Sequence, residues 1–161
     1  MKHTDFDELD YRILKELKKD ARKSASEIAR VVGANPRTVR NRIDRMAESD
    51  AVRLTAVVDP ATFGYIISID VFLEISPDHE TEIIQSLLSM PEVSYLANGT
   101  STNEISVEAR LKDAEQVGSF LRKKLPAIPG VKVKGYALVP GILRNIDEWM
   151  PPPEEFGSSK D

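Results

Sequence analysis

A stretch that begins at Ser24 constrains the fold most, because it carries the signals for two short helices joined by a tight turn. Ser24 and Glu27 form a capping box, in which the Ser hydroxyl accepts from the Glu27 N–H and the Glu carboxylate accepts from the Ser24 N–H. Gly33 can adopt the positive φ that ends a helix. Asn35 is a favoured N-cap, and Pro36 suits the first helical position. The stretch therefore predicts a helix, a turn at Gly33 and a second helix.

Apolar residues in and before this stretch repeat at helical spacing. Ile28, Val31 and Val32 should form one stripe on the first of these two helices. A further helix is predicted upstream, with Asp7 as its N-cap. Three such helices can close a small core, for which we predict Leu9, Ile13, Leu17, Ile28, Val32, Val39, Ile43 and Met46.

Long hydrogen-bond donors crowd the exposed side of the last helix. In a helix-turn-helix, the N-terminal residues of the second helix meet base edges in the major groove, where Arg can bond guanine and Asn can bond adenine. The competing interpretation is a solvated helix face on which Asp44 pairs with Arg40. We predict direct readout by Arg37, Thr38, Arg40 and Asn41, and further DNA contacts by Ser24, Asn35 and Arg45, with Lys23 and Arg53 on phosphates.

Charge is unevenly distributed along the chain. The 161 residues carry a formal net charge of −4, which argues against wholesale coating of nucleic acid. Residues 1–55 nevertheless have a net charge of +3, whereas residues 56–161 have −7. The basic N-terminal part can face phosphate while the acidic part faces elsewhere.

Composition excludes several classes of site. The chain has no Cys, so disulfides, thiolate metal sites and Cys nucleophiles are ruled out. We predict no cofactor and no metal site. No apolar run approaches the roughly 18 residues of a membrane span, and no export signal is recognisable, so a cytoplasmic protein without a membrane partner is expected.

The remaining chain alternates between strand and helix patterns. Residues 52–58 alternate as a strand does, and we interpret them as a wing or a link to a second domain. Asp59-Pro60 and Gly64 mark a turn. The predicted domains are a winged helix-turn-helix over 1–58, a linker over 59–64, a second domain over 65–146 and a tail over 147–161.

The second domain has the order βαββαβ. Strands are predicted over 65–76, 93–97, 105–111 and 131–139, with helices over 78–89 and from Asp113. This order is the ferredoxin-like split motif, in which two helices cover one face of a four-stranded antiparallel sheet, so the fold class is α+β. Its other face needs a cover, and sheet-to-sheet dimerisation is the simplest one.

The tail is expected not to form a folded element. It contains Trp149, three consecutive prolines and a Gly-Ser-Ser run. Two interpretations of Trp149 stay open: it docks on a neighbouring subunit, or it is a lone exposed aromatic.

The order and spacing of these pieces resemble the Lrp/AsnC family of transcriptional regulators, also called feast/famine regulatory proteins. The resemblance implies a winged helix-turn-helix that binds double-stranded DNA. It also implies a RAM-type βαββαβ domain that forms homodimers or larger oligomers and binds a small effector, commonly an amino acid. The pieces that carry it are Phe6 to Asp10, Asp20 to Arg22, the helix-turn-helix, Asp59-Pro60, Gly64-Tyr65, Asn98-Gly99 and Ile128 to Val131.

Two departures from the family pattern matter. Asp50 stands where Gly is usual before the linking strand, so we expect a left-handed residue there at slight cost. The hairpin after Asn98 is two residues longer, with Glu104 where Asp usually falls. Backbone N–H groups there would suit an amino-acid carboxylate, and Asn103 or Glu104 its ammonium group; a plain polar hairpin tip is the alternative. The predicted effector residues are Asn98, Gly99, Thr100, Ser101, Asn103 and Glu104.

The function expected is sequence-specific regulation of transcription by a two-fold dimer or larger oligomer on a pseudo-palindromic site, modulated by a small molecule. One alternative is an architectural DNA binder of low specificity. Another is an enzyme, since tetrapyrrole decarboxylases resemble this two-domain arrangement. His3 and His79 are badly placed for a haem ligand or a general acid, so we expect no catalytic residue.

Overall fold

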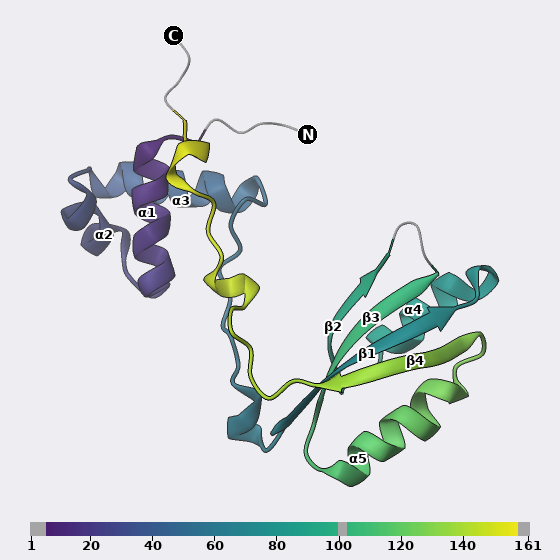
Figure 1. Cartoon of the computed structure of the whole chain (residues 1–161). Helices are drawn as coiled ribbons and strands as arrows, with labels where there is room; N and C mark the ends of the chain where they lie inside the picture. The colour runs from purple at the N-terminus through teal and green to yellow at the C-terminus, as the bar shows by residue number, and fades with distance from the viewer. Residues whose placement is uncertain (1–5, 100–102, 158–161) are drawn as a thin grey trace. The chain divides into compact units, whose positions relative to one another are not determined.

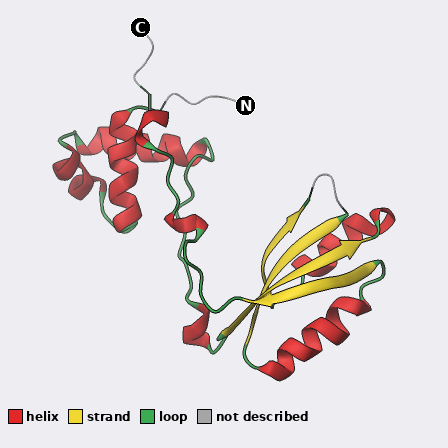
Figure 2. Ribbon diagram, in the orientation of Figure 1, coloured by secondary structure: helices red, strands yellow, loops and turns green. Residues whose placement is uncertain are grey.

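A computed structural model describes residues 6–99 and 103–157, which divide into two compact units. The helical unit comprises Met1–Val57 together with Arg144–Asp161, and the sheet unit comprises Val58–Leu143 (Figure 1). The two units differ in secondary structure, because all the strands, drawn in yellow in Figure 2, belong to the sheet unit. No helix in the described part of the chain is long and apolar enough to cross a membrane.

The helical unit contains α1 (Glu8–Lys19), α2 (Ala25–Val32) and α3 (Pro36–Glu48). Their caps are those that the sequence predicts. Asp7 accepts from the N–H groups of Leu9 and Asp10, and Ser24 forms the capping box with Glu27. Gly33 ends α2 with φ of 69°. Asn35 is the N-cap of α3, and its side chain accepts a hydrogen bond from the Arg37 N–H. The helix-turn-helix is confirmed.

The three helices enclose one small core, with Ile13, Ile28 and Val39 fully buried at its centre. All the predicted members belong to it, although Leu9 and Ile43 are only partly buried. The prediction for Val31 is wrong. Its side chain is 58% exposed, because Ala29 rather than Val31 turns toward α1 and α3. The side chains that are buried in this core are Ile13, Leu17, Ile28, Ala29, Val32, Val39 and Met46.

The chain leaves α3 through Asp50, which adopts the left-handed conformation expected there, with φ of 59°. Residues 52–58 are extended but pair with no strand in the described part of the chain, so the predicted wing strand is not formed. A strand gains its hydrogen bonds from a neighbour, and alternation alone supplies none. Leu54 and Val57 are accordingly 49% and 65% exposed.

The sheet unit confirms the βαββαβ order. Its strands are β1 (Ile67–Ile75), β2 (Val93–Asn98), β3 (Glu104–Leu111) and β4 (Val131–Leu138), in the spatial order β2-β3-β1-β4 with antiparallel pairing. Helix α4 (Glu80–Leu88) follows β1 and α5 (Ala114–Ser119) follows β3. This is the ferredoxin-like arrangement that the sequence predicts.

The register places alternate side chains on opposite faces of the sheet. Val71 of β1 opposes Val107 of β3, and both are fully buried against Ile83 and Leu87 of α4 and Phe120 after α5. Both helical segments therefore cover one face. Leu88, the last residue of α4, is 60% exposed.

The second crossover is less regular than predicted. After α5 the chain makes a π-helical turn over Phe120–Lys124 and a 3-10 turn over Leu125–Ala127. Pro126 has no N–H to donate and cannot extend an α-helix, and π turns accommodate such interruptions. Phe120 and Leu125 are both buried in the core of the sheet unit.

The C-terminal segment differs from the expectation of an unfolded tail. It makes 3-10 turns over Ile146–Glu148 and Pro153–Glu155, and Phe156 is 9% exposed. The Phe156 ring contacts Tyr11 of α1 edge to face, with centroids 5.1 Å apart. Lys18 of α1 donates from Nζ to the carbonyl oxygens of Asp147 and Trp149. These contacts lie up to 145 positions apart in the sequence, beyond the reach of local patterns.

Candidate nucleic-acid interface

Helix α3 is fastened to α1 by ion pairs that converge on Asp10, whose side chain is fully buried. Asp10 Oδ2 lies 3.0 Å from Arg42 Nη1 and 2.5 Å from Arg45 Nη2, and it accepts from the backbone N–H of Asp7. Asp7 Oδ1 lies 2.5 Å from Arg42 Nη1. Hydrogen bonds between charged groups are strong and also fix the relative orientation of the two side chains. They orient α3 from its inner side.

The same ion pairs shift the pKa values of the groups involved. The hydrogen bond from Arg42 is the main cause that lowers the pKa of Asp7, and Asp7 in return raises the pKa of Arg42. Arg45 also stacks over Phe6, with its guanidinium carbon 5.5 Å from the ring centroid. Sequence reasoning placed Arg45 in the DNA interface and missed its pairing with Asp10. Asp10 at the third position of α1 indicates a capping box, but no local sequence pattern predicts that it also pairs with Arg42 and Arg45, which lie 32 and 35 residues later.

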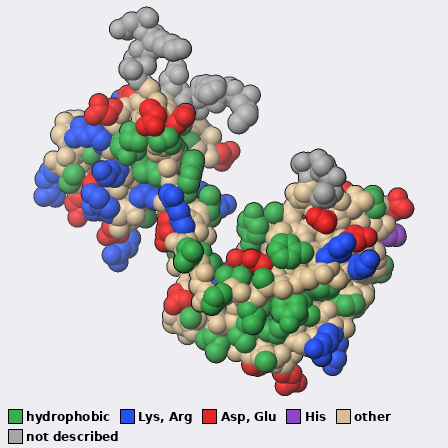
Figure 3. Space-filling model, in the orientation of Figure 1, with side chains coloured by type: hydrophobic (Ala, Val, Ile, Leu, Met, Phe, Trp, Pro, Cys, Tyr) green, Lys and Arg blue, Asp and Glu red, His purple; other side chains and the backbone are tan. Residues whose placement is uncertain are grey.

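The predicted base readers lie on the outer side of α3. Arg37, Thr38, Arg40 and Asn41 are all exposed. Neither arginine forms an ion pair with any carboxylate in residues 6–99 or 103–157, so the Arg40–Asp44 pair of the competing interpretation is absent there. Lys and Arg side chains are prominent on the surface of the helical unit in Figure 3. This surface offers long donors on a rigid helix.

Lys23 and Ser24 lie at the start of α2 and already have partners. Lys23 Nζ is 2.6 Å from Glu16, which also binds Lys19 at 2.5 Å. Hydrogen bonds from these two lysines lower the pKa of Glu16 to about 2. The Ser24 hydroxyl serves the capping box. Both residues are consequently fixed in place, and a phosphate contact by Lys23 would share its charge with Glu16.

The depressed pKa of Glu16 predicts acid sensitivity of the helical unit. Its folded pKa of about 2 lies below its ordinary value of 4.5, so its contribution to stability is complete above pH 4.5 and disappears as pH falls toward 2. The stability difference between wild type and Glu16→Gln should therefore shrink over that window. Urea unfolding followed by Trp149 fluorescence measures it. Glu48→Gln, at the exposed end of α3, should retain the wild-type pH dependence.

The predicted effector hairpin joins β2 to β3. The Gly99 N–H donates to the Glu104 carbonyl at 3.0 Å, and Asn98 Nδ2 donates to Glu80 of α4 at 3.4 Å. Glu104 opposes Glu74 of β1 in the register. The structure thus brings Asn98, Gly99, Asn103 and Glu104 together at one end of the sheet, whereas Thr100 and Ser101 lie outside the described residues.

The enzyme alternative would need histidine or acidic side chains brought together at one site. Within residues 6–99 and 103–157, no group of three or more His, Asp or Glu side chains could hold a metal ion. His79 is exposed in the turn before α4, and His3 lies outside the described residues.

Comparisons with known proteins match both units. A model of the AsnC-type helix-turn-helix domain matches residues 6–47. Over 144 residues the chain is 33% identical to an uncharacterized HTH-type transcriptional regulator of Pyrococcus furiosus, covering 89% of this chain and 95% of that protein. E. coli AsnC has a similar fold, with a TM-score of 0.76, 24% identity and coverage of 88% and 97%. A transcriptional regulator of Neisseria meningitidis, solved as its L-Met complex, also has a similar fold. Its TM-score is 0.79 and its sequence identity is 19%, and the match covers 86% of this chain and 92% of that chain.

Proposed function

Because this chain belongs to the Lrp/AsnC family of HTH-type transcriptional regulators, we propose that it regulates transcription as a two-fold dimer that reads a specific DNA site through α3. The observation that carries this proposal is the exposed set Arg37, Thr38, Arg40 and Asn41 on a helix whose other side is pinned to Asp10. Such a helix keeps its donors at fixed positions against base edges.

Other residues supply contacts that position the protein without reading sequence. We propose that Lys23, Arg45 and Arg53 approach phosphates, and that Ser24 and Asn35 flank them at the helix starts. A two-fold dimer would protect two half-sites whose centres are about 10 bp apart, or a multiple of that spacing. Hydroxyl-radical footprinting on a bound site measures it. Protection without that periodicity would contradict the dimeric geometry.

We propose that the dimer forms through the sheet face opposite α4 and α5. Phe72 of β1 is 50% exposed on that face, and Tyr95 of β2 is 60% exposed. Asp70 and Glu108 stand opposite each other, next to Arg110. Like charges in direct opposition destabilise a sheet, so a second copy that brings Arg110 over Asp70 would relieve them. Hydrophobic side chains reach the surface of the sheet unit in Figure 3.

Replacement of Phe72 by glutamate is the prediction that tests this face. The side chain is half exposed in one chain, so the fold should survive, whereas a dimer would bury a new charge at its centre. Sedimentation equilibrium should find the monomer as the main species. Leu143→Glu, at a fully exposed residue beyond β4, should leave the assembly unchanged.

We further propose that an amino acid modulates DNA binding from the hairpin of Asn98, Gly99, Thr100, Ser101, Asn103 and Glu104. Two observations support it: polar residues gather at this end of the sheet, and the Neisseria regulator of similar fold was solved with L-Met. Calorimetric titration with amino acids, one at a time, is the test. Glu104→Gln should weaken the ammonium contact about tenfold, since hydrogen bonds to charged groups contribute about 1.5 kcal/mol or more. Glu115→Gln on α5 is the control. Equal affinities in both variants would contradict this site.

A further inference from the structure

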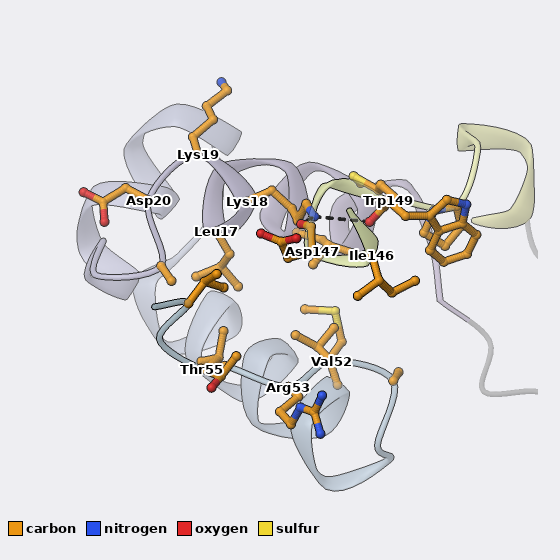
Figure 4. A pocket seen from close by; sticks show the side chains of 18 of the residues that line it. Leu17, Lys18, Lys19, Asp20, Val52, Arg53, Thr55, Ile146, Asp147 and Trp149 are labelled. Atoms are coloured by element: carbon orange, nitrogen blue, oxygen red, sulfur yellow. Dashed lines mark hydrogen bonds between the residues drawn. The ribbon is translucent and has the colours of Figure 1, made fainter. Parts of the chain in front are cut away.

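The helical unit contains a cavity that shares only Arg53 with the DNA contacts proposed above. Its volume is about 590 Å³, within the range of roughly 300–1,000 Å³ typical of small-molecule sites. Figure 4 shows its walls: Leu17 and Lys18 come from α1, Val52 and Arg53 from the segment after α3, and Ile146 and Trp149 from the C-terminal segment. Three parts of the chain that are distant in sequence therefore build one concave site.

The walls are mainly apolar and remain open to solvent. Ile146 is 79% exposed and Trp149 is 53% exposed although both line the cavity, and Leu54 beside them is 49% exposed. Apolar side chains around a hollow favour an apolar occupant, because its burial removes both surfaces from water. The occupant should therefore have an apolar body.

The charged groups at the cavity leave a positive surplus. Lys19 is paired with Glu16, and Asp20 with Arg22. Of the remaining lining residues, Lys18 and Arg53 are cations and Asp147 is an anion. Arg53 has no ion pair within the described ranges.

Lys18 is held at the rim in a state that can accept a further partner. Its ammonium group donates to the carbonyl oxygens of Asp147 and Trp149, as the dashed lines in Figure 4 indicate. An ammonium group has three N–H donors, so one remains for a ligand. The Arg53 guanidinium lies apart from this ammonium group on another wall of the cavity (Figure 4), and because it has no ion pair in the described ranges it suits a carboxylate.

We propose that this cavity binds a small amphipathic monoanion, with an apolar body against Leu17, Val52, Ile146 and Trp149 and a carboxylate toward Arg53. Such a ligand contacts α1 and the C-terminal segment at once, so it holds that segment against the helix-turn-helix. The site is separate from the β2–β3 hairpin and from the exposed residues of α3, and Arg53 is the one lining residue that is also proposed to approach phosphate.

Trp149 provides the test, because it is the single Trp of the chain and lines the cavity. The full chain, without DNA, is titrated with octanoate while Trp149 fluorescence is recorded. Octan-1-ol serves as the uncharged probe and octylammonium as the probe of opposite charge. We expect a saturable change with octanoate, and affinities at least fivefold weaker for the other two probes.

Two pairs of variants locate the response. Arg53→Gln and Ile146→Asp should each weaken octanoate binding at least fivefold, the first by removing the cation and the second by placing a carboxylate in the apolar wall. Arg122→Gln and Leu143→Asp, which change an arginine and an aliphatic residue outside the cavity, should bind octanoate as wild type does. No saturable response, equal affinities for octanoate and octan-1-ol, or equal effects of both pairs would each overturn the proposal.

Discussion

Replacement of Asp10 by alanine is expected to lower the free energy of unfolding of the helical unit by about 3 kcal/mol. Removal of one partner from a buried ion pair costs roughly 3–5 kcal/mol, and the low end applies because Arg42 and Arg45 retain some contact with water. Their side chains are 23% and 45% exposed, whereas Asp10 is fully buried. Urea unfolding followed by Trp149 fluorescence measures the change in this unit.

Two variants separate charge from packing at this position. Asp10→Asn keeps the volume but loses the charge, so it should fall between wild type and Asp10→Ala. Asp44→Ala, which removes an exposed carboxylate from α3, should change stability by less than about 0.5 kcal/mol. A loss of less than 1 kcal/mol in Asp10→Ala would show that Asp10 does not fasten α3 to α1.

Replacement of Arg37 by alanine should weaken binding to the preferred DNA site about 10- to 100-fold and relax base preference at one position. A bidentate contact between Arg and guanine contributes roughly 1–3 kcal/mol of discrimination. Affinity for random-sequence DNA should change much less, because phosphate contacts supply it. Fluorescence anisotropy with a matched pair of labelled duplexes measures both affinities at one salt concentration.

Matched variants define what this result means. Lys23→Ala should weaken binding to both duplexes by similar factors, as expected for a phosphate contact. Arg122→Ala, an exposed arginine of the sheet unit, should bind both duplexes as wild type does. Equal loss on both duplexes for Arg37→Ala would make Arg37 a phosphate contact and remove the basis for readout at that position.

The elements of both units could be predicted because their signals are local. Asp7, Ser24, Gly33 and Asn35 each define a helix end within three or four residues, and the alternation of Ile105 to Leu111 defines β3. Residues chosen for exposed positions on α3 are exposed, since the opposite stripe of that helix is apolar. The order of elements then limits the sheet unit to few topologies.

Features that depend on distant partners could not be predicted. Asp10 meets Arg42 and Arg45 only after α1 and α3 pack, and Phe156 finds Tyr11 only after the chain returns from the sheet unit. The alternation of residues 52–58 indicates a strand but carries no information about a partner. The cavity beside Trp149 follows from the same long-range return and has no local sequence signal.

Selection of bound sequences from randomised DNA, with the purified full chain at two salt concentrations and no added ligand, tests the central claim most directly. The account predicts a two-fold-symmetric motif that is recovered at both salt concentrations, with half-sites about one helical turn apart or a multiple of it. Retention that depends steeply on salt but yields no motif would contradict specific readout through α3 and favour an architectural DNA binder.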